Sequence, residues 1–218
     1  MIDSTNNKNH NHKNSETSGK KLFVKYMVCL RDKIVLQSEL DRLGFNYEIT
    51  VHGAVHFLNE FTVDQYQELR KSLSKFGLVL LDEHDSMLIN RIIQTIVQVI
   101  HYSDALPKLK FSDLISDYAG EETDSILKIF SDVKGMSVLQ FIIIQKIERA
   151  KEMLLYEDMP LSEIAELLNY KNQHYLAAQM KKVTGLTPLD FKRLKEERLK
   201  IAGQQEAILN SGITKANI

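Results

Sequence analysis

The sequence predicts an α+β protein in which a small N-terminal domain of strands and helices precedes an all-helical C-terminal domain. Within residues 21–84, β-branched and aromatic runs alternate with segments of helical periodicity, in the order strand, helix, strand, strand, helix, strand. After Leu106, apolar residues recur at helical spacing, and Gly, Asn or Pro separates the segments. The order of elements in residues 21–84, βαββαβ, is the split βαβ pattern of a ferredoxin-like domain.

The first three elements of this pattern come from short local signals. The run "KLFVKYMV" (21–28) is typical of a strand, and "RDKIVLQSELDRLG" (31–44) carries leucines on one helical side. "YEITVHGAVHFLNE" (47–60) holds two strand-like runs around Gly53, so we expect a β-hairpin there.

Capping signals mark the second helix of the N-terminal domain. Thr62 and Gln65 form a capping box at its start, and Tyr66, Leu69, Leu73 and Phe76 are expected on its apolar side. Gly77 ends this helix before the apolar run "LVLLD" (78–82), which we interpret as the last strand.

A connecting helix is predicted over residues 85–106, because "DSMLINRIIQTIVQVIHYSD" contains no turn signal before Ser103. Its apolar residues cover more than one helix face, so it should pack against a neighbouring domain or a second subunit. The expected organisation has five parts: a disordered tail at 1–20, the ferredoxin-like domain at 21–84, the connecting helix at 85–106, the helical domain at 107–200 and a flexible tail at 201–218.

Composition narrows the class of protein. The 218 residues are 44% hydrophobic, but no run approaches the length of a membrane span, and the polar N-terminus lacks the apolar core of a secretory signal. Cys29 is the single cysteine, which excludes an intramolecular disulfide and suits a reducing compartment. We therefore expect a cytoplasmic protein with no membrane partner.

The stretch "LSEIAELLNYKNQHYLAAQMKKVTGLTP" (161–188) predicts two short helices joined by a sharp turn. Leu161, Ile164, Ala165 and Leu168 form one buried stripe, and Asn169 suits a left-handed turn residue. Leu176, Met180 and Val183 are expected on the buried side of the second helix. Gly185 ends this helix, and "TPLD" (187–190) caps the next one.

The exposed side of the second helix is typical of a surface that reads DNA. The spacing of the apolar residues alone fits an αα-hairpin in a structural bundle equally well. Gln173 and His174 stand where side chains reach base edges, whereas Lys171 and Asn172 should touch phosphate and cap the helix. The remaining outward residues are Ala177, Ala178, Lys181 and Lys182.

Charge is distributed unevenly along the chain despite a net charge of −1. Residues 171–200 contain eight basic and three acidic residues, a net of +5, whereas residues 108–135 contain four basic and six acidic residues, a net of −2. The basic C-terminal end suits a polyanion such as double-stranded DNA. Within it, Lys192 to Lys200 fits a solvated helix face equally well.

Residues 110–195 resemble the AraC/XylS family of bacterial transcription regulators. The resemblance rests on "IERAKEMLLYEDMPLSEIAELLNY" and "QMKKVTGLTPLDFKRLK". It implies two helix-turn-helix units, the first within 111–135 and the second at 161–184, joined by a long helix over 137–155. The implied partners are duplex DNA and, for an activator, RNA polymerase; a homodimer would form through 85–106 or the N-terminal domain.

Two features depart from the family pattern. Ala178 stands where relatives often carry a large polar residue; alanine contacts a thymine methyl but makes no bidentate base contact. Glu121, Glu122 and Asp124 lie near the start of the first unit's reading helix, where they should repel phosphate. We therefore expect the second unit to carry most of the sequence discrimination.

The N-terminal domain weakly resembles heavy-metal-associated domains. "MVCLRD" (27–32) occupies the position of their M-x-C-x-x-C motif, but Asp32 replaces the second cysteine. A carboxylate is a poor ligand for soft copper(I), so Cys29 is only a weak metal candidate and no cofactor is expected.

The predicted function is sequence-specific DNA binding by a transcriptional regulator. No phosphate-binding glycine loop, nucleophile motif or metal-spaced His/Glu pair points to an enzyme. The alternative is a degenerate relative that acts as a protein adaptor or metal-handling module without binding DNA.

Overall fold

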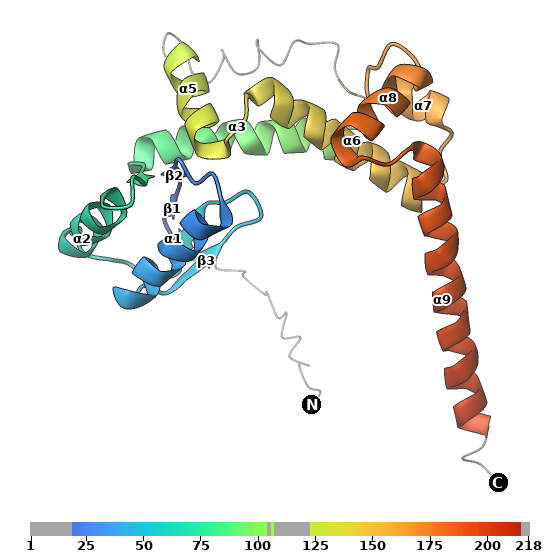
Figure 1. The fold of residues 1–218 in the computed structure, drawn as a ribbon, viewed down its shortest axis with the longest axis horizontal. Coiled ribbons are helices and arrows are strands. Elements are labelled where there is room, and N and C mark those ends of the chain that lie inside the picture. The colour runs from blue at the N-terminus through green and yellow to red at the C-terminus, as the bar shows by residue number, and fades with distance from the viewer. Residues whose placement is uncertain (1–18, 104–105, 107–122, 215–218) are drawn as a thin grey trace, which may run out of the picture.

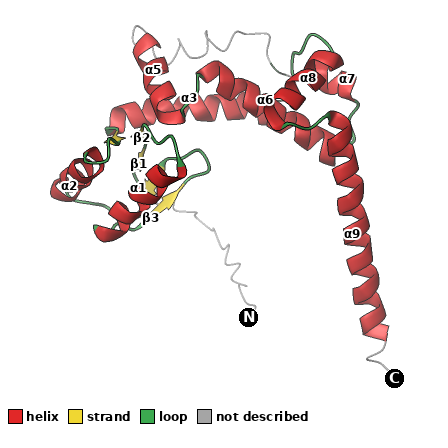
Figure 2. Cartoon of the chain, viewed as in Figure 1, coloured by secondary structure: helices red, strands yellow, loops and turns green. Residues whose placement is uncertain are grey.

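The computed structural model describes residues 19–103, 106 and 123–214, and the N-terminal part follows the predicted βαββαβ order. Its elements are β1 (Lys21–Leu22), β2 (Val24–Lys25), α1 (Leu30–Arg42), β3 (Tyr47–Ile49), β4 (Val55–Phe57), α2 (Val63–Ser74) and β5 (Val79–Leu80). We call these elements the N-terminal module. Figure 2 shows that its strands are short and that helices make up most of the chain.

The strand pairing gives the sheet order of a split βαβ fold. β1 pairs with β4, β4 with β3, and β2 with β5, all antiparallel. Since β1 and β2 are two pieces of the first strand, the spatial order is fourth, first, third, second strand. Gly53, with φ of +85°, lies in the turn of the β3–β4 hairpin, a conformation that glycine adopts without strain. The predicted hairpin and the predicted order of elements along the chain are confirmed.

The first strand divides its side chains between two cores. Leu22 and Val24 point into a core formed with α1 and α2, whereas Phe23, one residue out of phase, packs into the core of the helical half. Alternation along a strand dictates this division. The backbone N–H of Phe23 donates to the buried Ser86 hydroxyl (3.1 Å), where the strand is interrupted. The sheet thus has a helical layer on each face.

The helical half comprises α3 (Glu83–Tyr102), α5 (Thr123–Lys134), α6 (Val138–Tyr156), α7 (Leu161–Leu167), α8 (Gln173–Thr184) and α9 (Pro188–Thr214). In Figure 1, α3 and α6 run side by side, with the N-terminal module below one end and α7 and α8 at the other, while α9 projects away. None of the described helices is both long and apolar enough to cross a membrane.

The connecting helix α3 is buried on more than one side by its own chain. Asp82 caps its start by accepting from the backbone N–H of Asp85 (2.9 Å). Five isoleucines of α3 join the core shared with α5 to α8: Ile89, Ile92, Ile93, Ile96 and Ile100. As expected, a neighbouring domain covers this helix: the N-terminal module packs against it, and so do the other helices of the helical half.

Three features differ from the sequence expectation. Phe76 is 50% exposed, because α2 ends at Ser74 and Phe76 lies in the following turn. Lys20 belongs to the described part, where it pairs with Glu83 (3.0 Å), although we expected a disordered tail to residue 20. The expected flexible tail at 201–218 is helical as far as Thr214, because helix-forming Ala, Gln, Glu and Leu dominate "IAGQQEAIL" and no proline interrupts it.

Candidate nucleic-acid interface

Helix α6 is the scaffold of the candidate site. It begins at Ser137, whose hydroxyl accepts from the backbone N–H of Gln140 (3.2 Å), and it runs over the predicted range. Phe141, Ile147 and Ala150 are buried among residues from α3, α5, α7 and α8. His101 of α3 contacts Gln145 and Glu152 of α6 through its two ring nitrogens. Both ends of the helical half are therefore held on one rigid element.

The turn between α7 and α8 has the conformation that the sequence predicted. Asn169 has φ of +54°, and the next backbone N–H, from Tyr170, donates to Ala165 (2.8 Å). The Asn169 side chain donates to the Leu106 carbonyl (3.0 Å). Lys146 of α6 donates to the Leu168 carbonyl (2.9 Å), so the turn is fixed to the scaffold. Burial lowers the pKa of Lys146.

Asn172 caps the start of α8. Its side-chain oxygen accepts from the backbone N–H of Tyr175 (2.9 Å), as the sequence predicted. We expect Asn172→Ala to lower the free energy of unfolding by about 1 kcal/mol, since alanine offers no acceptor to the first turn. Asn172→Ser keeps a hydroxyl acceptor and should be nearly neutral. Urea denaturation of both variants measures this, and an equal loss from the two would contradict the capping role.

The candidate site residues share the exposed side of α8 and the turn before it. Gln173, His174 and Ala178 are exposed, as are Lys171, Lys181 and Lys182, and Leu176 and Met180 are fully buried beneath them. Ala177 is only half-buried, because it lies between the two faces. Tyr175, 60% exposed at the first turn, was not singled out from the sequence; its spacing of three residues from Ala178 and seven from Lys182 was the signal that places it on the exposed side.

The segment after α8 is defined by two caps. Gly185 has φ of +78° and ends α8. Thr187 and Asp190 then form the predicted capping box: the Thr187 backbone N–H donates to Asp190 (2.9 Å), and the Asp190 backbone N–H donates to the Thr187 hydroxyl (3.3 Å). The Thr187 hydroxyl (2.6 Å) and the Thr187 backbone N–H both donate to the Asp190 carboxylate and lower its pKa. Phe191, buried, anchors α9 against the same core.

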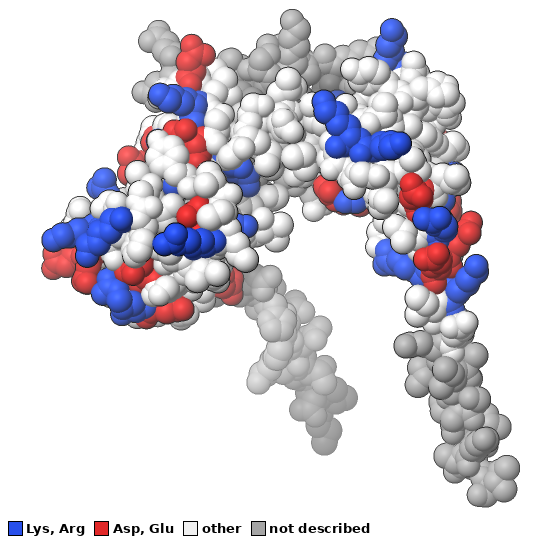
Figure 3. Space-filling view, viewed as in Figure 1, with Lys and Arg blue, Asp and Glu red and all other residues white. Residues whose placement is uncertain are grey.

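Basic residues of α9 differ from those of α8 in their partners. Lys195 pairs with Asp158, Arg193 with Asp190, and Arg198 donates to the Tyr156 hydroxyl (3.1 Å). Lys195 and Arg198 thus hold the start of α9 to the end of α6 and the loop after it, whereas the Arg193 pair lies within α9. Figure 3 shows a group of basic side chains over the α6 to α8 end of the body, whereas basic and acidic side chains mix along α9.

Tyr170 carries a buried hydroxyl that has no hydrogen-bond partner among the described residues. Its ring packs against the core and lies 5.4 Å from the Lys146 ammonium. We expect Tyr170→Phe to raise the free energy of unfolding by about 1 kcal/mol, because it removes an unsatisfied buried polar group. Tyr175→Phe, at an exposed position, is the matched control and should change nothing. A destabilised Tyr170→Phe would show that the hydroxyl makes a favourable interaction.

The same substitution predicts a pH effect. Burial raises the pKa of Tyr170 from 10.0 to about 12. The unfolded chain therefore releases this proton first, and the wild type should lose stability as the pH rises from 10 towards 12. Tyr170→Phe should lack this component in urea denaturation series across that interval.

The first helix-turn-helix unit is described only in part. Of the acidic residues expected near its reading helix, Asp124 is exposed on α5, and Glu121 and Glu122 lie outside the described residues. The C-terminal end of α5 contacts the N-terminal module: the Tyr26 backbone N–H donates to the Asp132 carbonyl (2.8 Å), and Lys134 donates to the His52 carbonyl (2.8 Å). Burial is the main cause of the lowered pKa values of Lys134 and His52.

Cys29 and Asp32 form a helix cap at the start of α1. The Asp32 carboxylate accepts from the backbone N–H groups of Val28 and Cys29, each at 2.9 Å, and these hydrogen bonds lower its pKa. Asp32 thus caps the helix at the position where the metal-binding motif has its second cysteine. Cys29 is exposed, and the described residues contain no group of three or more His, Cys, Asp or Glu placed to hold a metal ion.

Comparison with known proteins gives a family match for part of the helical half. Residues 115–194 match the family model described as "Helix-turn-helix domain". The uncharacterized transcriptional regulatory protein YesN of Bacillus subtilis is 31% identical over 114 residues, which are 51% of this chain and 30% of that protein. The xylose operon regulatory protein of Escherichia coli is 24% identical over 104 residues, 47% of this chain and 26% of that protein. Residues 115–194 are a helix-turn-helix domain of the AraC type, as the sequence resemblance predicted.

Two solved structures show partial similarity to this chain. The C-terminal domain of AraT, a response regulator from Geobacillus stearothermophilus, is 25% identical with a TM-score of 0.42, covering 49% of this chain and 84% of that one. The DNA-binding domain of AdpA, solved with a target DNA, is 15% identical with a TM-score of 0.41, covering 50% of this chain and 94% of that one. The chain spans less than a third of the curated relatives above.

Proposed function

We propose that this protein is a sequence-specific DNA-binding regulator of transcription that reads the major groove with α8. The observation that carries the proposal is the composition of the free side of α8, where amide, imidazole and ammonium groups are exposed on a helix with a fully buried opposite side. An α-helix fits the major groove, and its N-terminal residues reach base edges.

Each exposed residue has a role in this proposal. Gln173 pairs with adenine through its amide, and His174 donates to guanine. Ala178 contacts a thymine methyl group. Lys171, Lys181 and Lys182 neutralise phosphates, which adds affinity without sequence preference. Asn172 holds the start of α8, so that the reading residues approach the groove at a fixed angle.

The similar proteins support this proposal, because one is named as a transcriptional regulatory protein and the other as a xylose operon regulatory protein. The present chain aligns with only a part of each. Action in the cytoplasm, a homodimer through α3 or the N-terminal module, and contact with RNA polymerase belong to the same proposal.

The test is a gel-shift selection with the full chain and fragmented genomic DNA of the source organism. Fragments retained at moderate salt should share a common short sequence, and competitor DNA of random sequence should displace them poorly. If fragments are retained only at low salt and share no common sequence, the protein binds DNA without sequence preference. Absence of retention at both salt concentrations would contradict DNA binding altogether.

A further inference from the structure

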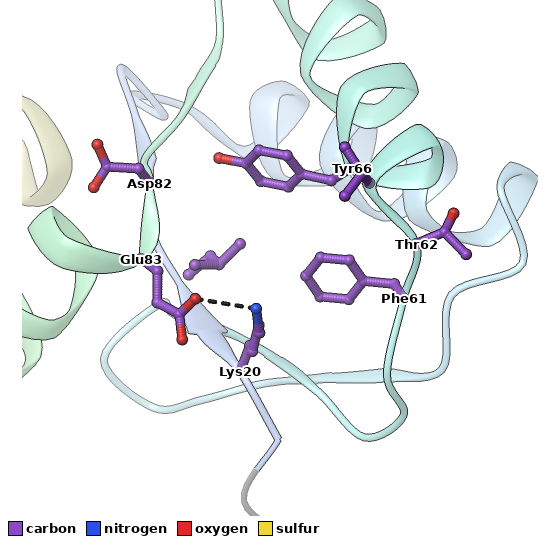
Figure 4. A pocket seen from close by; sticks show the side chains of 8 residues that line it. Lys20, Phe61, Thr62, Tyr66, Asp82 and Glu83 are labelled. Atoms are coloured by element: carbon purple, nitrogen blue, oxygen red, sulfur yellow. Dashed lines mark ion pairs between the residues drawn. The ribbon is translucent and has the colours of Figure 1, made fainter.

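A cavity of about 250 Å³ lies between the N-terminal module and the start of α3, and none of its lining residues belongs to the proposed reading helix. It opens between the first strand, the start of α2 and the start of α3 (Figure 4). Leu22, Phe61 and Tyr66 supply its apolar walls, and Lys20 and Glu83 stand at its mouth. The Phe61 and Tyr66 rings lie nearly parallel, at 16°, with centroids 6.1 Å apart.

The charged groups show which kind of ligand this cavity suits. The Lys20 ammonium lies 5.7 Å from the Phe61 ring centroid and 3.0 Å from a Glu83 carboxylate oxygen. An ammonium ion over an aromatic face and beside a carboxylate is the arrangement that proteins use to bind organic cations. Lys20 therefore marks the position that a ligand's ammonium group would take.

Lys20 can leave this position with little penalty, whereas the backbone of Glu83 is held in place by α3. Both side chains are about half exposed, and an ion pair with that exposure contributes little to stability. Glu83 is the first residue of α3, whose following turns are buried in the core. Its neighbour Asp82 already accepts from the backbone of Asp85, so Glu83 is the carboxylate that faces the cavity mouth.

We propose that the cavity binds a small organic ammonium ion with an apolar or aromatic body, whose ammonium group displaces Lys20 from Glu83. The apolar body would contact Leu22 and the two rings. The volume is below that of a typical drug-sized site, which indicates a ligand of roughly ten heavy atoms. This inference does not depend on DNA binding, because the cavity and α8 share no residue.

The test uses the full chain, isothermal titration calorimetry and three probes of similar shape. Phenethylammonium should bind, while neutral 2-phenylethanol and anionic phenylacetate should bind about tenfold more weakly or not at all, because they lack the cation. Lys20→Ala should strengthen phenethylammonium binding severalfold, since it removes the competing ammonium group. A gain in affinity cannot arise from misfolding, so this variant protects the test against a damaged protein.

Two further variants complete the design. Glu83→Gln should weaken phenethylammonium binding about tenfold while leaving the shape of the cavity unchanged. The matched control is Glu60→Gln, an exposed carboxylate outside the cavity lining, which should have no effect. The proposal is overturned if phenethylammonium does not bind at millimolar concentration, if 2-phenylethanol binds as well, or if Glu83→Gln leaves the affinity unchanged.

Discussion

The full chain should bind duplex DNA with an affinity that falls by about three orders of magnitude between about 50 and 200 mM salt, as expected when some six phosphates are neutralised. Each basic residue that contacts a phosphate displaces condensed counterions, so the logarithm of the binding constant falls linearly with the logarithm of salt concentration. The double substitution Lys181→Ala and Lys182→Ala should reduce this slope by about 1.8, because about 0.9 is lost for each contact. Fluorescence anisotropy over a salt series measures both quantities.

A control must show whether the change in salt dependence comes from the loss of two positive charges or from their position on α8. Lys71→Ala with Lys75→Ala removes the same charge from exposed positions at the end of α2, on the N-terminal module. That variant should keep the wild-type slope. If the two double variants change the slope equally, DNA does not contact α8 preferentially, and the assignment of Lys181 and Lys182 to phosphate contacts is wrong.

Replacing Gln173 and His174 together by alanine should abolish preference over one half-site while nonspecific binding persists. Each residue is expected to supply about 1 to 3 kcal/mol of discrimination between bases, so the pair accounts for a change of at least about thirtyfold in relative affinity. Both side chains are exposed at the first turn of α8, where its cap keeps the backbone in place. Selection of preferred sites from a random duplex library compares the variant with the wild type.

The control for this experiment is a substitution in the first helix-turn-helix unit. Asp124→Asn removes an exposed acidic charge from the start of α5 and should leave the preferred sequence unchanged, with affinity equal or higher. The reverse result, in which Asp124→Asn erases the preference and the Gln173 and His174 substitutions do not, would show that the two reading helices have been exchanged in our assignment.

The α7 to α8 region could be predicted from the sequence because its signals are local. The apolar spacing, Asn169, the Asn172 cap and Gly185 each act within a few residues, and all four have the predicted conformation. The pairs that Lys195 and Arg198 make could not be predicted, since their partners Asp158 and Tyr156 lie 37 and 42 residues away. The roles of the candidate residues towards DNA stay predictions.

The N-terminal module shows the same division between local and distant causes. One capping box and the β-branched and aromatic runs predicted its order of elements, and the capping box of Thr62 and Gln65 forms as expected. The sequence did not indicate that Phe23 leaves the core of its own module, because that depends on where α3 lies against the sheet. The pocket around Phe61 and Tyr66 depends on the same placement and was not predicted either.

The position of α3 has a mechanical consequence. Its start is hydrogen-bonded to the first strand through Ser86, and its isoleucines are buried with apolar residues of α5 to α8, so α3 packs directly against both the N-terminal module and the rest of the helical half. A displacement of the module would travel as a tilt of one stiff rod against α6. The two halves of the protein are therefore joined by a rigid helix rather than by a flexible linker. Cleavage of the chain after α3 would separate both the N-terminal module and this helix from α5 to α9.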